Sequence, residues 1–159
     1  MFIDTTMTVT VDELLHGLII QSGNDAAITL AEGIAGSEEL FAALMNKKAA
    51  LLGMKNSHFV NATGLPDPTH MTTARDLSIL ANALIRDFPQ DYKRLYSQKE
   101  YTYNKITQPN RNRLLFLDPS VDGMKTGHTE SAGYCLISSA KREDFRLISV
   151  VLGTASDNV

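Results

Sequence analysis

Two helical segments joined by a three-residue turn limit the possible folds of this chain more than any other part of it. Apolar residues recur at helical spacing from Val11 to about Gln21, and Thr10 and Glu13 have the spacing of a capping box. The segment 25–35 is apolar on nearly every side, as expected of a helix buried in a domain core. The intervening Ser22-Gly23-Asn24 is therefore predicted to be a turn held between two anchored helices.

Helical periodicity and stop signals predict three more helices, over 38–52, 74–87 and 89–95. Turn-forming residues and alternation predict four smaller elements: a short strand near 58–60, an ordered surface loop over 61–68, a strand over 99–105 and a polar connector over 110–113. The β-rich runs 134–140 and 145–152, separated by four charged residues, predict an antiparallel hairpin. Helices followed by antiparallel strands indicate an α+β fold.

Bulk properties point to one soluble domain. The chain has 159 residues, 43% of them apolar and 21% charged, and a length of this order buries roughly 70% of the surface that the unfolded chain exposes. A net charge of −3 argues against a nucleic-acid partner. No apolar run is long enough to span a bilayer, and no signal peptide begins the sequence. Cys135 is the single cysteine and is predicted to be a small buried residue in a strand.

The chemistry is concentrated in Lys125-Thr126-Gly127, which places a basic side chain, a hydroxyl and a glycine just before the predicted hairpin. A match at these three positions is expected by chance about 0.02 times in a chain of this length. Ser22-Gly23-Asn24 fits the looser pattern Ser-x-Asn, which is weak evidence alone, and Ser156-Asp157-Asn158 matches it too. We expect Ser22-Gly23-Asn24 and Lys125-Thr126-Gly127 to face each other across one groove suited to an anionic peptide end.

Ser-x-Asn and Lys-Thr-Gly are two of the three motifs shared by class A β-lactamases and penicillin-binding proteins. The chain further resembles the low-molecular-mass penicillin-binding proteins that are serine-type D-alanyl-D-alanine carboxypeptidases, in five segments: 19–26, 61–65, 72–76, 108–115 and 122–127. The resemblance covers essentially all 159 residues. It implies a β-lactamase/transpeptidase-like fold, with a helical lobe and an antiparallel sheet, and a partial domain of the S11 peptidase type over residues 1–159.

The family's first motif, Ser-x-x-Lys, supplies the nucleophilic serine and lies upstream of Ser-x-Asn. The one match here, Ser138 to Lys141, follows Lys-Thr-Gly and falls in a predicted strand, where positions i and i+3 point to opposite faces. We interpret it as coincidental. The resemblance thus implies a chain cut at both ends, which lacks the nucleophile and a carboxylate-binding arginine beyond Val159. We expect such a chain to be inactive alone and to expose apolar edges.

The resemblance implies catalytic roles for Ser22, Asn24 and Lys125. Ser22 would pass a proton to the leaving amine, Asn24 would hydrogen-bond the substrate backbone, and Lys125 would lend positive potential to both Ser22 and the substrate carboxylate. Taken by themselves, these residues have simpler interpretations. Ser22 and Asn24 are good caps for the following helix, and an isolated lysine is usually a solvated surface residue.

The substrate-binding residues implied by the resemblance are Thr126, Gly127 and His128. The Thr126 hydroxyl would bind the substrate carboxylate, Gly127 would let the substrate backbone approach the strand, and the backbone N–H of His128 would supply half of an oxyanion hole. Arg111 and Arg113 have two interpretations, contact with an anionic cell-wall strand or salt bridges within a connector, and the sequence favours the second.

The expected partner is a peptidoglycan stem peptide ending in D-Ala-D-Ala, with β-lactam antibiotics as inhibitors. No cofactor is expected, and the histidines show no metal-ligand spacing. By resemblance the intact protein acts at the periplasmic face of the inner membrane, held there by a C-terminal anchor that this sequence does not contain. Two alternatives are a class A-like β-lactamase, disfavoured because no glutamate lies between Glu39 and Glu100, and a non-catalytic fragment that binds D-Ala-D-Ala or cell wall.

Overall fold

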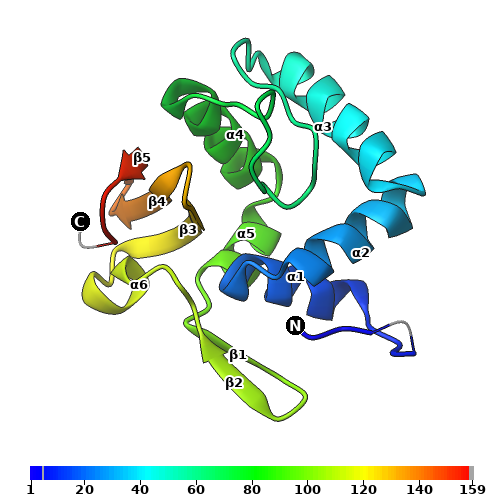
Figure 1. Ribbon diagram of the computed structural model, residues 1–159. Coiled ribbons are helices and arrows are strands. Elements are labelled where there is room, and N and C mark those ends of the chain that lie inside the picture. The colour runs from blue at the N-terminus through cyan, green and yellow to red at the C-terminus, as the bar shows by residue number, and fades with distance from the viewer. Residues whose placement is uncertain (5, 158–159) are drawn as a thin grey trace.

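The computed structural model describes residues 1–4 and 6–157 and places a helical lobe against a three-stranded sheet (Figure 1). The elements follow in the order α1 (Val11–Gln21), α2 (Asn24–Ala35), α3 (Glu38–Leu52), α4 (Ala74–Asp87), α5 (Pro89–Tyr96), β1 (Glu100–Tyr103), β2 (Ile106–Pro109), α6 (Leu114–Leu117), β3 (Val121–Thr129), β4 (Gly133–Arg142) and β5 (Phe145–Thr154). This architecture confirms the predicted α+β class. In the described part of the chain, no helix has the length and apolar character that crossing a bilayer requires.

The junction between α1 and α2 is as short as the sequence indicates. Thr10 and Glu13 form the predicted capping box at the start of α1. Ser22 ends α1 in the left-handed conformation, with φ at 60°, and its N–H donates to carbonyls of the last turn. Gly23 is already the N-cap of α2. The chain therefore changes direction over two residues, which fixes Ser22 relative to both helices.

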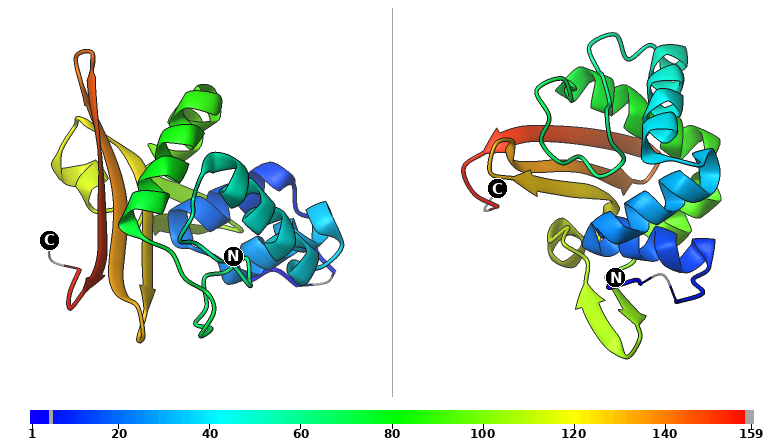
Figure 2. Two further views of the ribbon diagram at one scale, coloured as in Figure 1. Left: turned by 90° about the horizontal axis from the view of Figure 1, so that it is seen from above. Right: turned by 45° about the vertical axis from the view of Figure 1, so that its right-hand side comes forward.

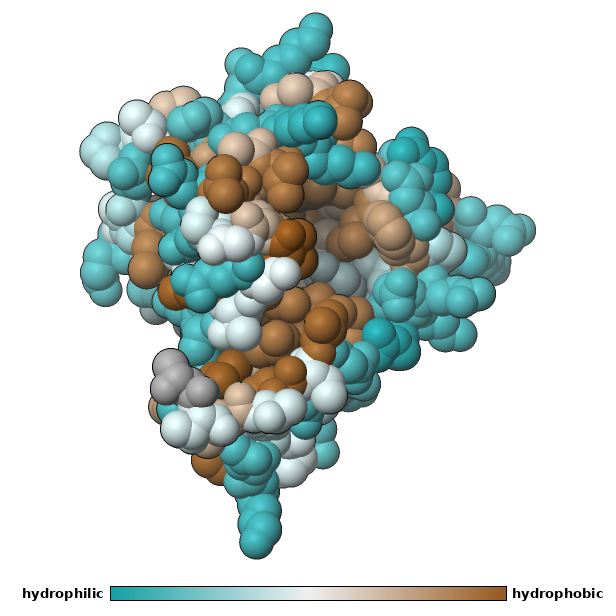
Figure 3. Space-filling model, turned by 90° about the vertical axis from the view of Figure 1, so that its right-hand side faces the viewer, coloured by the Kyte–Doolittle hydropathy of each residue, from teal (hydrophilic) through white to brown (hydrophobic). Residues whose placement is uncertain are grey.

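Burial of α2 is less complete than its composition predicts. Ala26, Ala27, Leu30 and Ala31 are buried, but Ile34 near its C-terminal end is 64% exposed. The expectation of a helix enclosed on every side is therefore wrong at that end. Figure 3, which views the molecule from the right-hand side of Figure 1, shows apolar side chains gathered around a hollow. Exposed apolar residues also lie along α3, namely Leu40, Leu44 and Leu51.

The main sheet has the antiparallel order β3-β4-β5, and α4 and α5 pack on one face of it (Figure 2). The predicted hairpin is confirmed as β4–β5. Lys125-Thr126-Gly127 precedes this hairpin, as predicted, and lies within a third strand, β3, which was not predicted and which pairs with β4 along its length. Cys135 on β4 is half-buried rather than buried, because its partner position across the sheet is Gly127, which has no side chain to cover it.

A polar cluster holds β3 against α5 and β5, and we call Tyr92, Asp122, Ser139 and Arg146 the anchor cluster. Arg146 donates to both oxygens of the Asp122 carboxylate at 2.8 Å and also to the Ser139 hydroxyl. The buried Tyr92 hydroxyl donates to Asp122 at 3.1 Å, and burial raises the pKa of this phenol well above its usual range. Every member of the cluster is partnered, so β3 is rigidly placed.

Three smaller elements differ from the sequence prediction. The strand expected over 99–105 is a two-stranded hairpin, β1–β2, because Asn104 and Lys105 both adopt positive φ and reverse the chain. The strand expected near residues 58–60 is a single bridge between His58 and Met71. The expected connector over 110–113 is present, and the short helix α6 that follows it was not predicted.

Candidate active site

The two predicted motifs are in direct contact. The Nζ atom of Lys125 on β3 donates to the Oγ atom of Ser22 at the α1–α2 junction over 2.5 Å, and also to the Thr126 carbonyl over 2.7 Å. These residues are far apart in sequence, so the contact exists only because the sheet packs against the helical lobe. The expectation that Ser22-Gly23-Asn24 and Lys125-Thr126-Gly127 face each other is confirmed by this contact. The expected groove between them is not found as one shared pocket among the described residues, because the pocket at this place is lined by only the first of the two motifs.

Lys125 is held in a poorly hydrated and electropositive place. Removal of its ammonium from water, followed by repulsion from the Arg111 guanidinium, lowers the pKa of Lys125 to about 8. With that pKa, about nine in ten Lys125 side chains are charged at pH 7. The side chain can therefore donate a hydrogen bond to Ser22 and can also release its proton far more readily than an ordinary lysine.

Ser22 and Asn24 do not act as caps of α2. The N-cap residue is Gly23, and no side-chain hydrogen bond caps that helix. Ser22 instead directs its hydroxyl at Lys125 from a left-handed backbone conformation, which is unfavourable for a residue with a Cβ atom. Asn24 is the first residue of α2, and its side chain is exposed. The capping interpretation of these residues is therefore wrong.

A pocket of about 330 Å³ lies beside the Ser22–Lys125 contact. It brings together Ser22 and Asn24 with residues from β2 and from the connector before α6; its full lining is Met1, Phe2, Gln21, Ser22, Gly23, Asn24, Asp25, Gln108 and Arg111. Lys125, Thr126, Gly127 and His128 are not among the lining residues. They continue the site from Ser22 along β3, so the site joins a pocket in the helical lobe to a strand edge.

The edge of β3 that carries Thr126 faces the helical lobe. The Thr126 carbonyl accepts from Lys125 Nζ, which also reaches Ser22, so this carbonyl points away from β4. Backbone groups alternate along a strand, so the N–H of His128 points to the same side. Gly127 and His128 are both exposed, and the centroids of the His128 and Tyr134 rings lie 4.0 Å apart. Because β3 is an edge strand of the described sheet, an N–H that points away from β4 has no neighbouring strand there to donate to and can donate to a ligand.

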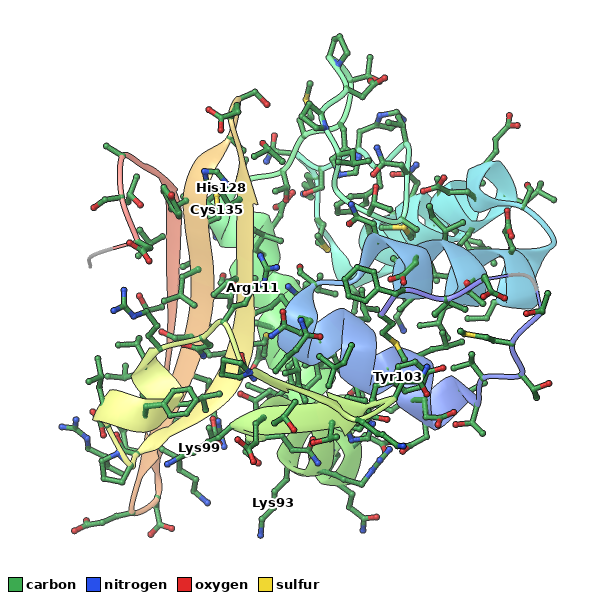
Figure 4. The ribbon with its side chains drawn as sticks, turned by 60° about the horizontal axis from the view of Figure 1, so that its bottom comes forward. Lys93, Lys99, Tyr103, Arg111, His128 and Cys135 are labelled. Atoms are coloured by element: carbon green, nitrogen blue, oxygen red, sulfur yellow. The ribbon has the colours of Figure 1, made fainter. Side chains whose placement is uncertain are left out.

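Arg111 is the site residue that sequence reasoning missed. The sequence favours a salt-bridging connector for Arg111 and Arg113, and Arg113 does pair with Asp157 at 3.2 Å. Arg111 instead lines the pocket with Ser22 and Asn24, on the side of the sheet that faces α1 (Figure 4). The salt-bridge interpretation is thus right for one arginine and wrong for the other. Both arginines are exposed and lie in the same polar run, so no sequence signal separates them.

The two other motif matches do not contribute to this site. Ser138 and Lys141 lie on β4, where Ser138 pairs with Met124 and Lys141 pairs with Arg146 on the next strand, so they point to opposite faces. In the match at 156–158, Asn158 lies outside the described residues. Among the residues that the structure describes, no three His, Cys, Asp or Glu side chains converge as metal ligands would.

Comparisons with known proteins agree with this geometry. A family model described as D-alanyl-D-alanine carboxypeptidase matches residues 1–156. The chain is 51% identical, over 160 residues, to the D-alanyl-D-alanine carboxypeptidase DacC of Escherichia coli (strain K12). The match covers 100% of this chain and 40% of that relative. The chain thus spans less than half the length of this relative.

Solved structures show the same fold. Penicillin binding protein 5 from Haemophilus influenzae matches with a TM-score of 0.94 and 48% identity, covering 98% of this chain and 46% of that one. Penicillin-Binding Protein D2 from Listeria monocytogenes in its ampicillin-bound form matches with a TM-score of 0.86 and 35% identity, covering 96% of this chain and 63% of that one. The chain therefore belongs to the D-alanyl-D-alanine carboxypeptidase family and has the transpeptidase-like fold of penicillin-binding proteins.

Proposed function

We propose that residues 1–159 are part of one transpeptidase-like domain, in a protein that removes the terminal D-alanine from peptidoglycan stem peptides through an acyl-serine intermediate. The observation that carries this proposal is the hydrogen bond between Lys125 Nζ and Ser22 Oγ. It joins two motifs that lie 103 positions apart in the sequence, and it involves a lysine whose burial costs stability. In this proposal the chain supplies the second and third motifs, and a Ser-x-x-Lys segment of the longer protein supplies the nucleophile.

The proposed reaction has two steps. The nucleophilic serine passes its proton to the neighbouring lysine of Ser-x-x-Lys as it attacks the carbonyl between the two D-alanines. The C–N bond then breaks, and the leaving amine takes a proton from the Ser22 hydroxyl. Water then hydrolyses the ester and releases the shortened peptide. Asn24 hydrogen-bonds the substrate backbone from the start of α2. Lys125 stabilises negative charge near Ser22 and at the substrate carboxylate.

Thr126, Gly127 and His128 would bind the substrate along β3. The Thr126 hydroxyl would donate a hydrogen bond to the terminal carboxylate, and the His128 N–H would donate to the oxyanion of the tetrahedral intermediate. Loss of one such donor costs about 3 kcal/mol of activation free energy in other acyl-transfer enzymes. A β-lactam would occupy the same groups as a substrate mimic, in line with the ampicillin-bound relative. We place the longer protein at the periplasmic face of the bacterial inner membrane.

The test is covalent labelling with a fluorescent penicillin, read by denaturing electrophoresis. We expect no labelling of this chain alone, because its one Ser-x-x-Lys match is divided between two faces of β4. Co-expression with a segment that carries the family's Ser-x-x-Lys motif should restore labelling. Lys125→Ala should then abolish it, since the ammonium that polarises Ser22 is lost.

Lys141→Ala is the matched control, because it removes the lysine of the coincidental motif from an exposed strand end. It should leave labelling of the complemented protein unchanged. Labelling of the chain alone that survives Lys125→Ala and disappears in Lys141→Ala would contradict the proposal, and would assign the nucleophile to Ser138. Reversible binding of D-Ala-D-Ala peptides without any labelling of the complemented protein would instead support a non-catalytic binding fragment.

A further inference from the structure

The connector between β2 and α6 presents one exposed residue between two buried ones. Asn110 is 5% exposed and Asn112 is 1% exposed, whereas Arg111 is exposed. The Asn110 side chain donates to the Gln98 carbonyl at 2.8 Å and accepts from the Asn112 N–H at 2.9 Å. The Asn112 side-chain oxygen in turn accepts from the N–H of Leu114. Side-chain amides therefore define the backbone path on both sides of Arg111.

The same connector is fastened to the end of α1. The backbone N–H of Arg111 donates to the Ile20 carbonyl at 3.3 Å, and the Gln21 side chain donates to the Pro109 carbonyl at 2.5 Å. Ile20 and Gln21 immediately precede Ser22. The backbone of Arg111 is thus held at a fixed position relative to the hydroxyl that contacts Lys125.

The Arg111 guanidinium is left without a counter-ion by this arrangement. Within residues 1–4 and 6–157, no ion pair or side-chain hydrogen bond involves it, whereas Arg113 pairs with Asp157. The buried NH₂ group of Asn112 also has no acceptor among those residues. A buried donor without a partner lowers stability, and a segment selected for stability alone would carry an apolar residue there.

Negative groups near Lys125 are occupied by other partners. The elements of the site and of the adjoining anchor cluster carry these charged and titratable residues: Asp25 on α2, Tyr92 on α5, Arg111 on the connector, Asp122 and His128 on β3, Cys135 on β4 and Arg146 on β5. Of these, Arg111 is the charge that acts on Lys125. Asp25 accepts from the Met1 amino group and the Ile3 N–H, and Asp122 is paired with Arg146. Neither carboxylate contacts the Lys125 ammonium, so Arg111 is the charge whose effect is not cancelled.

We propose that Asn110 and Asn112 are positioning residues that hold Arg111 beside the Ser22–Lys125 contact, and that Arg111 makes the Lys125 ammonium a stronger proton donor. The inference rests on the proposed function and adds a source for the leaving group's proton. As the C–N bond breaks, the leaving amine takes the Ser22 hydroxyl proton, and Ser22 Oγ is reprotonated from Lys125 Nζ. The neutral Lys125 amine regains a proton from water. Repulsion by Arg111, second only to burial, lowers the pKa of Lys125 in the direction that this transfer needs.

The test is the pKa of Lys125 in this chain, measured by NMR titration of ¹³C-labelled lysine side chains and assigned with Lys125→Met. Arg111→Gln should raise the Lys125 pKa by about 0.5, because it removes a like charge. Arg111→Lys should keep most of the lowering. Arg113→Gln is the matched control, since it removes a neighbouring arginine that already has a counter-ion, and it should leave the Lys125 pKa within about 0.1 of the parent value.

Asn112→Ala tests positioning, and it should raise the Lys125 pKa by about half the Arg111→Gln effect while Arg111 itself is unchanged. If Asn112→Ala fails to fold, Asn112→Ser is used in its place, because serine retains a side-chain oxygen. An unchanged Lys125 pKa in a folded Arg111→Gln protein would overturn the inference, as would equal effects of Arg111→Gln and Arg113→Gln. This measurement needs no nucleophile, so its failure is distinguishable from a failure of penicillin labelling in the complemented protein.

Discussion

Two polar clusters include residues of β3, and they differ in how their charges are balanced. In the anchor cluster, Arg146 and Asp122 neutralise each other and the buried hydroxyl of Tyr92 is satisfied. At the Ser22 junction, Lys125 is buried beside a second cation, Arg111, and contacts only a hydroxyl and a carbonyl. Both clusters order β3, but only the second retains unneutralised charge for a ligand.

This difference has a thermodynamic consequence. A charge that is paired when buried stabilises the fold only as long as both partners remain, whereas a buried charge without a counter-ion destabilises the fold throughout. Substitutions in the anchor cluster should therefore lower the free energy of unfolding. Substitutions of Lys125 or Ser22 should raise it, as expected for groups kept for function at the expense of stability.

The largest expected effect is in the anchor cluster. Arg146→Met removes the cationic partner of Asp122 and the guanidinium donor to the buried Ser139 hydroxyl, and should lower the free energy of unfolding by about 3 kcal/mol. Urea denaturation measures it. Adding Asp122→Asn should recover more than half of the loss, because the uncompensated charge is removed. A loss below about 1 kcal/mol in Arg146→Met would show that this ion pair does not hold β3, and the contrast between the clusters would fail.

The next effect has the opposite sign. The Lys125 pKa is about 8 in the folded state and near its ordinary value of 10.5 in the unfolded chain, so the native state binds fewer protons between these pH values. The free energy of unfolding should therefore rise with pH from about 8 to 10.5, and the destabilisation by Lys125 should be complete below pH 8. Lys125→Met should gain about 2 kcal/mol at pH 7, which allows for partial hydration of the ammonium.

Parallel urea titrations of the parent and Lys125→Met at several pH values isolate this term, since other groups titrate equally in both. The gain in Lys125→Met should disappear near pH 11. A gain that stays constant across this pH range would mean that better packing of methionine, and not the buried charge, accounts for it.

The smallest expected effect concerns Ser22. Its φ of 60° costs an L-residue on the order of 1 kcal/mol, so Ser22→Gly should raise the free energy of unfolding by about 0.5 kcal/mol after loss of the contact with Lys125. Ser22→Ala is the control, because it removes the hydroxyl but keeps the backbone strain. Calorimetry should show a higher Tm for the glycine variant than for the alanine variant. Equal Tm values for the two variants would mean that the left-handed conformation of Ser22 does not strain the backbone.

Local signals in the sequence predicted the helical lobe well because several helix ends there carry a local cap. Thr10, Ser37 and Thr73 all accept a backbone N–H as N-caps, and Gly36 and Gly53 end their helices in the left-handed conformation. The β1–β2 hairpin was missed because its turn uses Lys105 at positive φ, where a glycine would have signalled the reversal.

The site was predictable where a motif carried it and not elsewhere. Ser22 and Lys125 were identified by pairing two motifs, and the structure brings them together. The sequence favoured a salt bridge for both Arg111 and Arg113, because nothing in it shows which of the two arginines pairs with a carboxylate. That depends on the path of the connector across α1, which is a property of tertiary packing.

Gly127 differs from glycines that the fold itself requires. A Cβ atom at Gly123 would come within 2.3 Å of the Tyr92 hydroxyl, so the protein's own packing excludes a side chain there. At Gly127 the nearest atom to such a Cβ would be that of Cys135, at an ordinary 3.9 Å. Packing within the protein therefore does not require a glycine at this position. In the proposed function, the substrate backbone lies along β3 at this position, and the absence of a side chain leaves room for it.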